Sequence, residues 1–422
     1  MMNVTIGKST FSGKIKMASS KSHLHRALIC AALGDRMCRL YYNGSSDDVA
    51  ATINCLNALG AEIADKGEYF EILPIKQVKN GILPCNESGS TLRFMLPIAC
   101  ALGAECTLTG TEKLISRPLE PLISQLEKHG AKIEKYKDKI IISGRLTAGK
   151  YTVRGDISSQ FITGLLLALP LLEKDSELEI TGNIQSRPYI DMTLSVLRDF
   201  GMETEICKDN LIKIPTLGRF KAPDALNAEG DWSNAAFWLA LGAFSEAGIE
   251  TEGLSEDSTQ GDKKMLEIIG HAGAHITKKD SSYTVKKCKL KAFECDCADT
   301  PDLAPVICIL ASVCDGESRI HNVERLRLKE SDRIETTMAM VRALGGEIRY
   351  ENGALIINGK PKLKGGTVDS CNDHRIAMAA AVASAVCEEN VTILGANSVN
   401  KSYRSFWEVF EAIGGNVKKW EE

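Results

Sequence analysis

Apolar residues recur every three to four positions in six short segments of the chain, and each segment runs into a glycine. The segments are LNALGAEI, LEKHGAKI, LRDFGMET, IGHAGAHI, VRALGGEI and FEAIGGNV, with glycines at Gly60, Gly130, Gly201, Gly273, Gly345 and Gly414. This spacing predicts an amphipathic helix closed by a C-terminal glycine in each segment. The glycines recur about every 70 residues, which indicates six copies of one structural unit.

A second, more apolar segment accompanies each amphipathic one. These segments are HLHRALICAAL (23–33), TLRFMLPIACAL (91–102), QFITGLLLALPLL (160–172), NAAFWLALGAF (234–244), DLAPVICILASV (302–313) and RIAMAAAVASAV (375–386). Their apolar character predicts helices that are buried on all sides. Short alternating segments with turns, such as YENGALIING (350–359), predict paired strands after the amphipathic helices. Because 422 residues exceed one ordinary core, we expect two α/β domains of three units each.

Composition narrows the class of protein. The formal net charge is −4, from 51 basic and 55 acidic side chains, which argues against a surface that coats nucleic acid. No apolar run approaches the roughly 18 residues of a membrane span, and the N-terminal residues do not resemble a targeting signal, so we expect a cytoplasmic protein. The 14 cysteines include no C-x-x-C pair, which favours reduced thiols over a metal site.

Cations stand near the starts of several predicted helices. They are Lys21, Arg93, Arg117, Arg333, Arg375 and Lys401, often beside Ser, Gly or Gln. A helix N-terminus already carries partial positive charge, so a cation there is unfavourable unless an anion is also present. One such residue is best explained by solvent or by an adjacent acid, such as Asp332 or Asp373. Six at similar positions predict a site for a highly anionic ligand.

Seven motifs spread over the whole chain resemble those of the 5-enolpyruvylshikimate-3-phosphate synthase family, the 3-phosphoshikimate 1-carboxyvinyltransferases. They are SKSHLHRAL (20–28), SGSTLR (88–93), SRPLEP (116–121), SSQF (158–161), SRPYID (186–191), LKESDR (328–333) and NDHR (372–375). The resemblance implies an inside-out α/β (α+β) fold of two globular domains, each with three βαβαββ-like repeats. It implies one domain of residues 19–225, mainly on the shikimate 3-phosphate side. Residues 1–18 plus 226–422 would form the other domain, which would contribute the catalytic residues and residues that bind phosphoenolpyruvate. The active site would lie in the interdomain cleft.

The resemblance also implies a reaction of the shikimate pathway. The enolpyruvyl group of phosphoenolpyruvate would pass to the 5-hydroxyl of shikimate 3-phosphate through a tetrahedral intermediate, releasing phosphate. The implied partners are these two small molecules. We expect no cofactor, no metal ion, no nucleic acid and no membrane, and we expect a monomer.

The family's binding roles carry over residue by residue. The resemblance assigns shikimate 3-phosphate to Lys21, Ser22, Arg26, Ser158, Ser159, Ser186, Tyr189, Asp302 and Lys329. It assigns phosphoenolpyruvate to Lys21, Gly89, Arg117, Gln160, Arg333, Arg375 and Lys401. Planar guanidinium groups suit these ligands because they bind carboxylate and phosphate through two parallel hydrogen bonds.

The expected catalytic residues are Lys21, Asp302 and Glu330. Asp302 is our candidate base for the 5-hydroxyl proton, and Glu330 is our candidate proton donor to the methylene carbon, although the division of these roles stays open. Two residues depart from the family pattern, which commonly has Asn at both places. They are Glu87, before the SGST segment, and Arg325, and their roles also stay open.

Two other functions compete with this interpretation. The sister enzymes that transfer enolpyruvyl to UDP-N-acetylglucosamine share the fold and length, but they carry a reactive Cys before the equivalent of Arg117. The segment TLTGTEKLIS (107–116) has none, and Cys106 lies further upstream. A non-catalytic repeat protein that binds an anionic partner would not need the acid pair Asp302 and Glu330.

Overall fold

The chain forms two compact units in the computed structural model, which describes residues 2–204, 206–207 and 210–421. The continuous unit is Ser19–Ala228, and the split unit is Met1–Ala18 with Glu229–Glu422. The polypeptide re-enters the split unit at Glu229, slightly later than the boundary expected at residue 225. The reason is that β13 (Ala225–Asn227) pairs in parallel with β3 (Cys38–Tyr41) of the continuous unit.

The described residues of the continuous unit form three sheets, ordered β13-β3-β5-β4, β6-β7-β9-β8 and β10-β11-β12. Their further strands are β4 (Glu62–Asp65), β5 (Tyr69–Leu73), β6 (Gly81–Asn86), β7 (Cys106–Gly110), β8 (Ala131–Lys135), β9 (Lys139–Gly144), β10 (Lys150–Arg154), β11 (Ser176–Thr181) and β12 (Leu211–Ile214). The helices are α1 (Lys21–Ala32), α2 (Asp47–Ala58), α3 (Gly89–Leu102), α4 (Glu112–Ser116), α5 (Leu122–Lys128), α6 (Ser159–Ala168), η1 (Leu169–Leu171) and α7 (Arg187–Asp199).

The described residues of the split unit also form three sheets, ordered β15-β16-β14-β2, β17-β18-β20-β19 and β21-β22-β1-β23. The strands are β1 (Met2–Ile6), β2 (Gly13–Lys16), β14 (Ile249–Glu252), β15 (His275–Lys279), β16 (Ser282–Lys286), β17 (Glu294–Asp296), β18 (Glu317–His321), β19 (Glu347–Glu351), β20 (Ala354–Asn358), β21 (Gly366–Asp369), β22 (Val391–Leu394) and β23 (Val417–Glu421). The helices are α8 (Trp232–Phe244), η2 (Gly261–Lys264), α9 (Met265–His271), η3 (Pro301–Leu303), α10 (Ala304–Ala311), η4 (Glu324–Leu328), α11 (Arg333–Ala343), α12 (His374–Ala383), η5 (Ser384–Val386), η6 (Ala396–Lys401) and α13 (Phe406–Ala412).

A repeated βαβαββ pattern underlies these sheets. In the sheet of β6 to β9, for example, β6 runs parallel to β7 across the buried helix α3, and an antiparallel hairpin of β8 and β9 completes the sheet. The first strand of two repeats comes from elsewhere in the chain: β13 supplies it beside β3, and β2 supplies it beside β14. The predicted repeat architecture is therefore confirmed.

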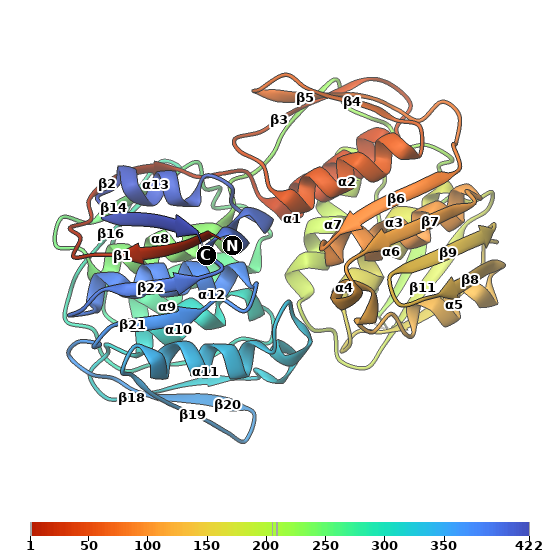
Figure 1. The fold of residues 1–422 in the computed structure, drawn as a ribbon. Helices are drawn as coiled ribbons and strands as arrows, with labels where there is room; N and C mark the ends of the chain where they lie inside the picture. Colours follow the sequence, from red (N-terminus) through yellow and green to blue (C-terminus); the bar gives the residue numbers. More distant parts are fainter. Residues whose placement is uncertain (1, 205, 208–209, 422) are drawn as a thin grey trace. The chain divides into compact units, whose positions relative to one another are not determined.

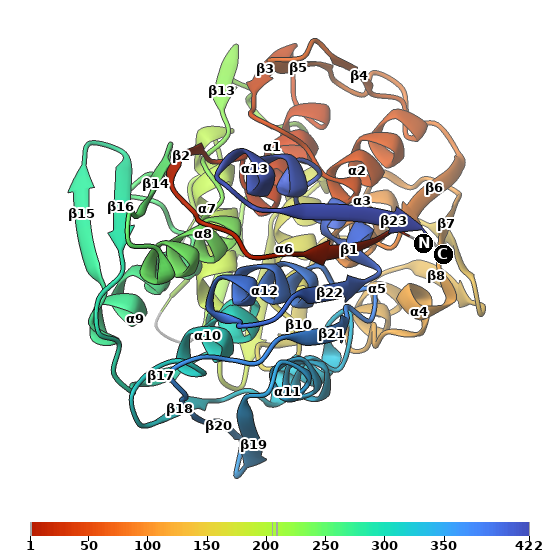
Figure 2. The same ribbon diagram turned by 60° about the vertical axis from the view of Figure 1, so that its left-hand side comes forward.

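The apolar helices form the centre of each unit. In the split unit α8, α10 and α12 pack against one another, with the sheets outside them (Figures 1 and 2). Every residue of α8, α10 and α12 is buried. In the continuous unit α3 packs against α6, which also contacts α1 and α7. This arrangement confirms the prediction that the apolar segments are buried helices, with sheets on the outside.

The six repeat glycines also match expectation. All six have positive φ, from 79° at Gly201 to 111° at Gly414, directly after a helix. A left-handed residue at this point lets the last carbonyls of the helix find partners, and glycine adopts it without strain. The Asn352–Gly353 pair between β19 and β20 has positive φ at both residues, as a two-residue hairpin turn requires.

Two predicted helix starts are wrong. α4 ends at Ser116 with Arg117 as its C-cap residue, and the next helix, α5, begins only at Leu122. In a helix that began at Arg117, residue 121 would have to donate its backbone N–H to the carbonyl of Arg117, and Pro121 has no N–H to donate. Lys401 ends η6 and does not begin α13, which starts at Phe406. No helix among the described residues is long and apolar enough to cross a membrane.

Candidate active site

Lys21 is the first residue of α1 and makes an ion pair with Asp48 at the start of α2. The Lys21 Nζ to Asp48 Oδ2 distance is 2.8 Å, and both side chains are less than one-fifth exposed. Ser20 caps α1 by accepting a hydrogen bond from the backbone of His23. Asp48 was not predicted to take part in the site, because in the sequence SSDD it looks like an ordinary acid in the first turn of a helix.

Arg26 joins three helices of the continuous unit. Its Nε donates to Thr193 Oγ1 on α7 at 2.8 Å, and its Nη2 donates to Tyr189 O at 3.0 Å and to Thr163 Oγ1 on α6 at 3.3 Å. Its Nη1 donates to Ser22 O at 2.6 Å. Arg26 is 3% exposed, and burial lowers its pKa to about 10. The residue predicted to bind a substrate is thus largely engaged by the protein.

A second group of polar side chains surrounds Gly89 at the start of α3. A Cβ atom on Gly89 would lie 2.8 Å from Arg117 Nη1 and 3.3 Å from Arg93 Nη1. Arg93 Nη1 also donates to Gln160 Oε1 at 2.6 Å, and Gln160 Nε2 donates to Ser90 Oγ at 2.9 Å. The structure therefore brings together three predicted residues, Gly89, Arg117 and Gln160, with Arg93 between them.

The predicted serines lie at helix N-termini. Ser158 caps α6 and accepts from the backbone of Gln160 at 3.3 Å, and Ser159 follows as the first residue of that helix. Ser186 precedes α7 in a left-handed conformation, with φ of 55°. Its carbonyl accepts a hydrogen bond from the backbone of Tyr189 at 3.1 Å. Helix N-termini favour anions, so these two helix starts suit the phosphate group that the serines are predicted to bind.

Arg333 is the centre of the polar cluster in the split unit. Its Nη1 lies 2.7 Å from Asp302 Oδ1, its Nη2 lies 2.6 Å from Glu330 Oε2, and its Nε lies 2.8 Å from Asp373 Oδ2. The guanidinium is fully buried, and Lys329 Nζ adds a further bond to Asp302 Oδ1 at 3.1 Å. Four of the predicted site residues are brought together directly: Asp302, Lys329, Glu330 and Arg333.

The charges of this cluster perturb one another. Burial opposes the ionisation of Asp302, but Lys329 and Arg333 outweigh that cost and hold the pKa of its carboxyl well below the ordinary value. Burial lowers the pKa of Lys329, the charges of Arg333 and Arg325 add to the lowering, and Asp302 and Glu330 oppose it. Arg325, which departs from the family pattern, therefore acts on the ammonium of Lys329. Asp302 is ionised at neutral pH, as a general base must be.

Arg375 is held from both ends of its guanidinium. Nη1 donates to Ser233 O at 3.0 Å, and Nη2 lies 3.6 Å from Asp302 Oδ2. The guanidinium also lies over the Phe237 ring, 5.7 Å from its centroid. Asp373 caps the start of α12 by accepting from the backbone of Arg375 at 2.9 Å.

Three of the six predicted cations stand at the start of a helix, namely Lys21, Arg333 and Arg375. Arg117 and Lys401 end helical turns, and Arg93 lies in the second turn of α3. Carboxylates of the protein itself neutralise the three that begin helices. The inference that the cations require a bound anion was therefore incomplete. Asp48 was not anticipated as a partner, because it looks like an ordinary acid at a helix start. Asp373 was expected to pair with an adjacent cation, but it pairs with Arg333, 40 positions away.

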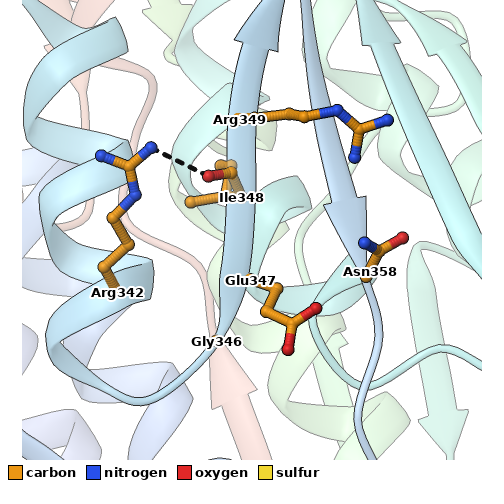
Figure 3. A pocket seen from close by; sticks show the side chains of 6 residues that line it. All are labelled: Arg342, Gly346, Glu347, Ile348, Arg349 and Asn358. Atoms are coloured by element: carbon orange, nitrogen blue, oxygen red, sulfur yellow. Dashed lines mark hydrogen bonds between the residues drawn. The ribbon is translucent and has the colours of Figure 1, made fainter.

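A separate pocket of about 300 Å³ lies on the split unit between α11 and the strands β19 and β20 (Figure 3). No predicted site residue lines it. Arg342 donates to Ile348 O at 3.0 Å, Arg349 pairs with Glu317 at 2.9 Å, and Glu347 pairs with Lys360 at 3.0 Å. The charged groups of the pocket are therefore satisfied by the protein.

Comparison with known proteins identifies the family. A model of EPSP synthase (3-phosphoshikimate 1-carboxyvinyltransferase) matches residues 6–410. The chain belongs to the EPSP synthase family. A curated relative from Clostridium kluyveri, named 3-phosphoshikimate 1-carboxyvinyltransferase, is 42% identical over 100% of this chain and 99% of its own length. A relative of the same name from Brachyspira hyodysenteriae is 40% identical over 99% of this chain and 100% of its own length.

Solved structures of the family and of a related transferase share the fold. An EPSP synthase from Acinetobacter baumannii superposes with a TM-score of 0.84 at 23% identity, covering 100% of both chains. The enolpyruvyl transferase NikO from Streptomyces tendae superposes with a TM-score of 0.83 at 16% identity, covering 99% of this chain and 98% of its own. At these identities the likeness establishes the α/β fold alone.

Proposed function

We propose that the chain transfers the enolpyruvyl group of phosphoenolpyruvate to the 5-hydroxyl of shikimate 3-phosphate and releases phosphate. The family match over nearly the whole chain supports the reaction. The observation that carries the chemistry is the position of Asp302 and Glu330, two carboxylates held on one buried guanidinium. This reaction needs one group to accept a proton and another to donate one.

The proton transfers follow from these two side chains. Ionised Asp302 accepts the 5-hydroxyl proton as the oxygen bonds to C2 of phosphoenolpyruvate. The protonated form of Glu330 gives its proton to C3, which becomes a methyl group, and Glu330 is left as the carboxylate. When the tetrahedral intermediate collapses, phosphate leaves and a carboxylate takes one methyl proton, which restores the double bond. Lys329, beside Asp302, stabilises negative charge at this point.

The binding assignments form the second part of the proposal. The continuous unit provides the helix starts of Ser158 and Ser186 for shikimate 3-phosphate, together with Lys21. Gly89, Arg117 and Gln160 of the same unit, with Arg333, Arg375 and Lys401 of the split unit, bind phosphoenolpyruvate. Both units therefore serve one reaction, and variants in either unit should impair it.

Phosphate release from phosphoenolpyruvate tests this proposal. Purified protein should release phosphate with shikimate 3-phosphate and not with UDP-N-acetylglucosamine. The second acceptor is disfavoured because the segment before Arg117 has no cysteine, and Cys106 at the start of β7 is 4% exposed, where burial raises the pKa of its thiol. Release with UDP-N-acetylglucosamine alone would replace the proposed function by that of the sister enzymes.

A further inference from the structure

A buried chain of hydrogen bonds links α1, α2 and α3 in the continuous unit. His25 Nδ1 lies 2.7 Å from Thr52 Oγ1, which lies 2.7 Å from Thr91 Oγ1, and Thr91 Oγ1 donates to Ser88 Oγ at 2.8 Å. These four residues are at most 1% exposed. This series of hydrogen bonds runs from the middle of α1 to the first turn of α3, and the proposed proton transfers do not use it.

Counting hydrogens fixes the direction of these bonds. Thr91 has one hydroxyl hydrogen, which it directs to Ser88 Oγ and to Asp48 O at 3.3 Å. Thr91 Oγ1 therefore accepts a hydrogen bond from Thr52, and this bond uses the only hydroxyl hydrogen of Thr52. Nδ1 of His25 must then be the donor in its bond to Thr52.

The state of the imidazole follows from this direction. Burial lowers the pKa of His25 well below its ordinary value, and the charges of Lys21 and Arg26 lower it further, so the ring is neutral. A neutral ring with its hydrogen on Nδ1 has an unprotonated Nε2. In the part of the chain that the structure describes, Nε2 is buried without a hydrogen-bond partner, as this tautomer allows.

The hydrogen-bonded chain ends at the turn that carries Gly89. Ser88 caps α3 by accepting from the backbone of Thr91 at 3.2 Å, so the two ends of the Ser88–Thr91 turn are joined. The carbonyl of Asp48 accepts from Thr91, and the carboxylate of Asp48 holds Lys21. One framework therefore positions both Lys21 and the glycine against which two guanidinium groups lie.

We propose that His25 is a positioning residue for phosphoenolpyruvate, acting through the Nδ1–H donor that orients Thr52, Thr91 and the Ser88–Thr91 turn. This inference rests on the proposed function. His25 touches no substrate, because it is fully buried and its ring packs edge-on against Phe94, 6.2 Å between centroids. Its effect is therefore on binding geometry and not on proton transfer.

Matched variants test the donor. His25→Leu and Thr52→Val interrupt the series of hydrogen bonds. Each should raise KM for phosphoenolpyruvate about ten-fold, because each leaves a buried polar group unsatisfied. KM for shikimate 3-phosphate should change less than about three-fold. His25→Asn places an amide N–H where Nδ1 stood and should keep both values within about two-fold of the native protein. His129→Leu removes a partly exposed imidazole that is not part of this series of hydrogen bonds, and it serves as the control.

The tautomer is measured independently of activity. In 15N NMR at neutral pH, the signal that disappears in His25→Asn should show a protonated Nδ1 and an unprotonated Nε2. A protonated Nε2, or an imidazolium, would overturn the inference, as would an unchanged KM in Thr52→Val or an equal defect in His25→Asn and His25→Leu. If the native protein released no phosphate, the proposed function would fail, while the NMR result would still decide the tautomer.

Discussion

Nη1 of Arg333 lies 2.7 Å from Oδ1 of Asp302, so one predicted ligand of phosphoenolpyruvate is bonded to the predicted catalytic base. The Arg333 side chain is 1% exposed, and it also bonds Glu330 and Asp373. The surrounding carboxylates raise the pKa of Arg333 well above its ordinary value, despite the opposing effect of burial. A substrate carboxylate that reaches Arg333 must share or replace these bonds, which links substrate binding to the state of Asp302.

Replacing Arg333 should destabilise the split unit. Arg333→Met leaves the fully buried Asp373 without its main cation and should cost about 3–5 kcal/mol. Arg327→Met is the matched control, because Arg327 is 40% exposed in its pairs with Asp332 and Glu335, and such pairs contribute less than about 1 kcal/mol. All four tryptophans lie in the split unit, so tryptophan fluorescence during urea unfolding reports on it. Equal midpoints for the two variants would contradict this account.

Asp48→Asn should weaken turnover by releasing Lys21. The ion pair is largely buried, so we expect a fall in kcat/KM for phosphoenolpyruvate of about ten-fold or more. Steady-state kinetics measure this. The neighbouring Asp47 is exposed, and Asp47→Asn removes the same charge from the same helix turn. A similar loss in both variants would show that the effect comes from helix charge and not from the ion pair.

Gly89→Ala should raise KM for phosphoenolpyruvate. The new Cβ atom would lie 2.8 Å from Arg117 Nη1, so the guanidinium must move away from the turn. We expect an increase of about ten-fold in KM and a small change in KM for shikimate 3-phosphate. Gly81→Ala is the control, since a Cβ atom there has no neighbour within 4 Å. Unchanged kinetics in Gly89→Ala would remove Gly89 from the proposed site.

The pH dependence of stability should reveal Asp262. Asp262 is 4% exposed, and burial together with the Asp302 carboxylate raises its pKa to about 6, although Arg375 and Ser233 oppose the rise. An unfolded Asp titrates near pH 4, so between about pH 4 and 6 the folded state binds more protons. Stability therefore falls as the pH rises through this window.

Asp262→Asn removes this penalty. The free energy of unfolding of Asp262→Asn minus that of the native protein should increase by about 1 kcal/mol from pH 5 to pH 7.5. Tryptophan fluorescence during urea unfolding measures both values. Asp257→Asn, at an exposed position, controls for the loss of charge. A constant difference across this range would mean that Asp262 has an ordinary pKa.

Local patterns predicted the elements of the fold, whereas long-range pairing determined much of the site. The repeat glycines and the Asp332 cap of α11, which accepts from Ile334 N and Glu335 N, follow from residues a few positions apart. Arg26 is held by residues on α6 and α7, more than a hundred positions away. Sequence spacing cannot reveal such partners, because the order of packing between helices decides them.

The same limit explains the misjudged cations. Asp373 and Arg333 are 40 residues apart and meet only because α11 and α12 pack together. In the sequence each looks like an isolated helix-start residue. The acid Asp302 comes from a third segment, before α10. The motifs identified the right residue types, but the structure was needed to show that carboxylates and cations there neutralise one another.

Product formation in the native protein and in Asp302→Asn tests the central claim most directly. The amide of this variant retains the shape of the side chain but cannot accept the 5-hydroxyl proton. In 31P NMR, the native protein with phosphoenolpyruvate and shikimate 3-phosphate should give inorganic phosphate and a new sugar-phosphate signal. Asp302→Asn should bind both substrates and lose at least about a thousand-fold in rate. Near-native turnover in Asp302→Asn, or no phosphate from the native protein, would contradict the account.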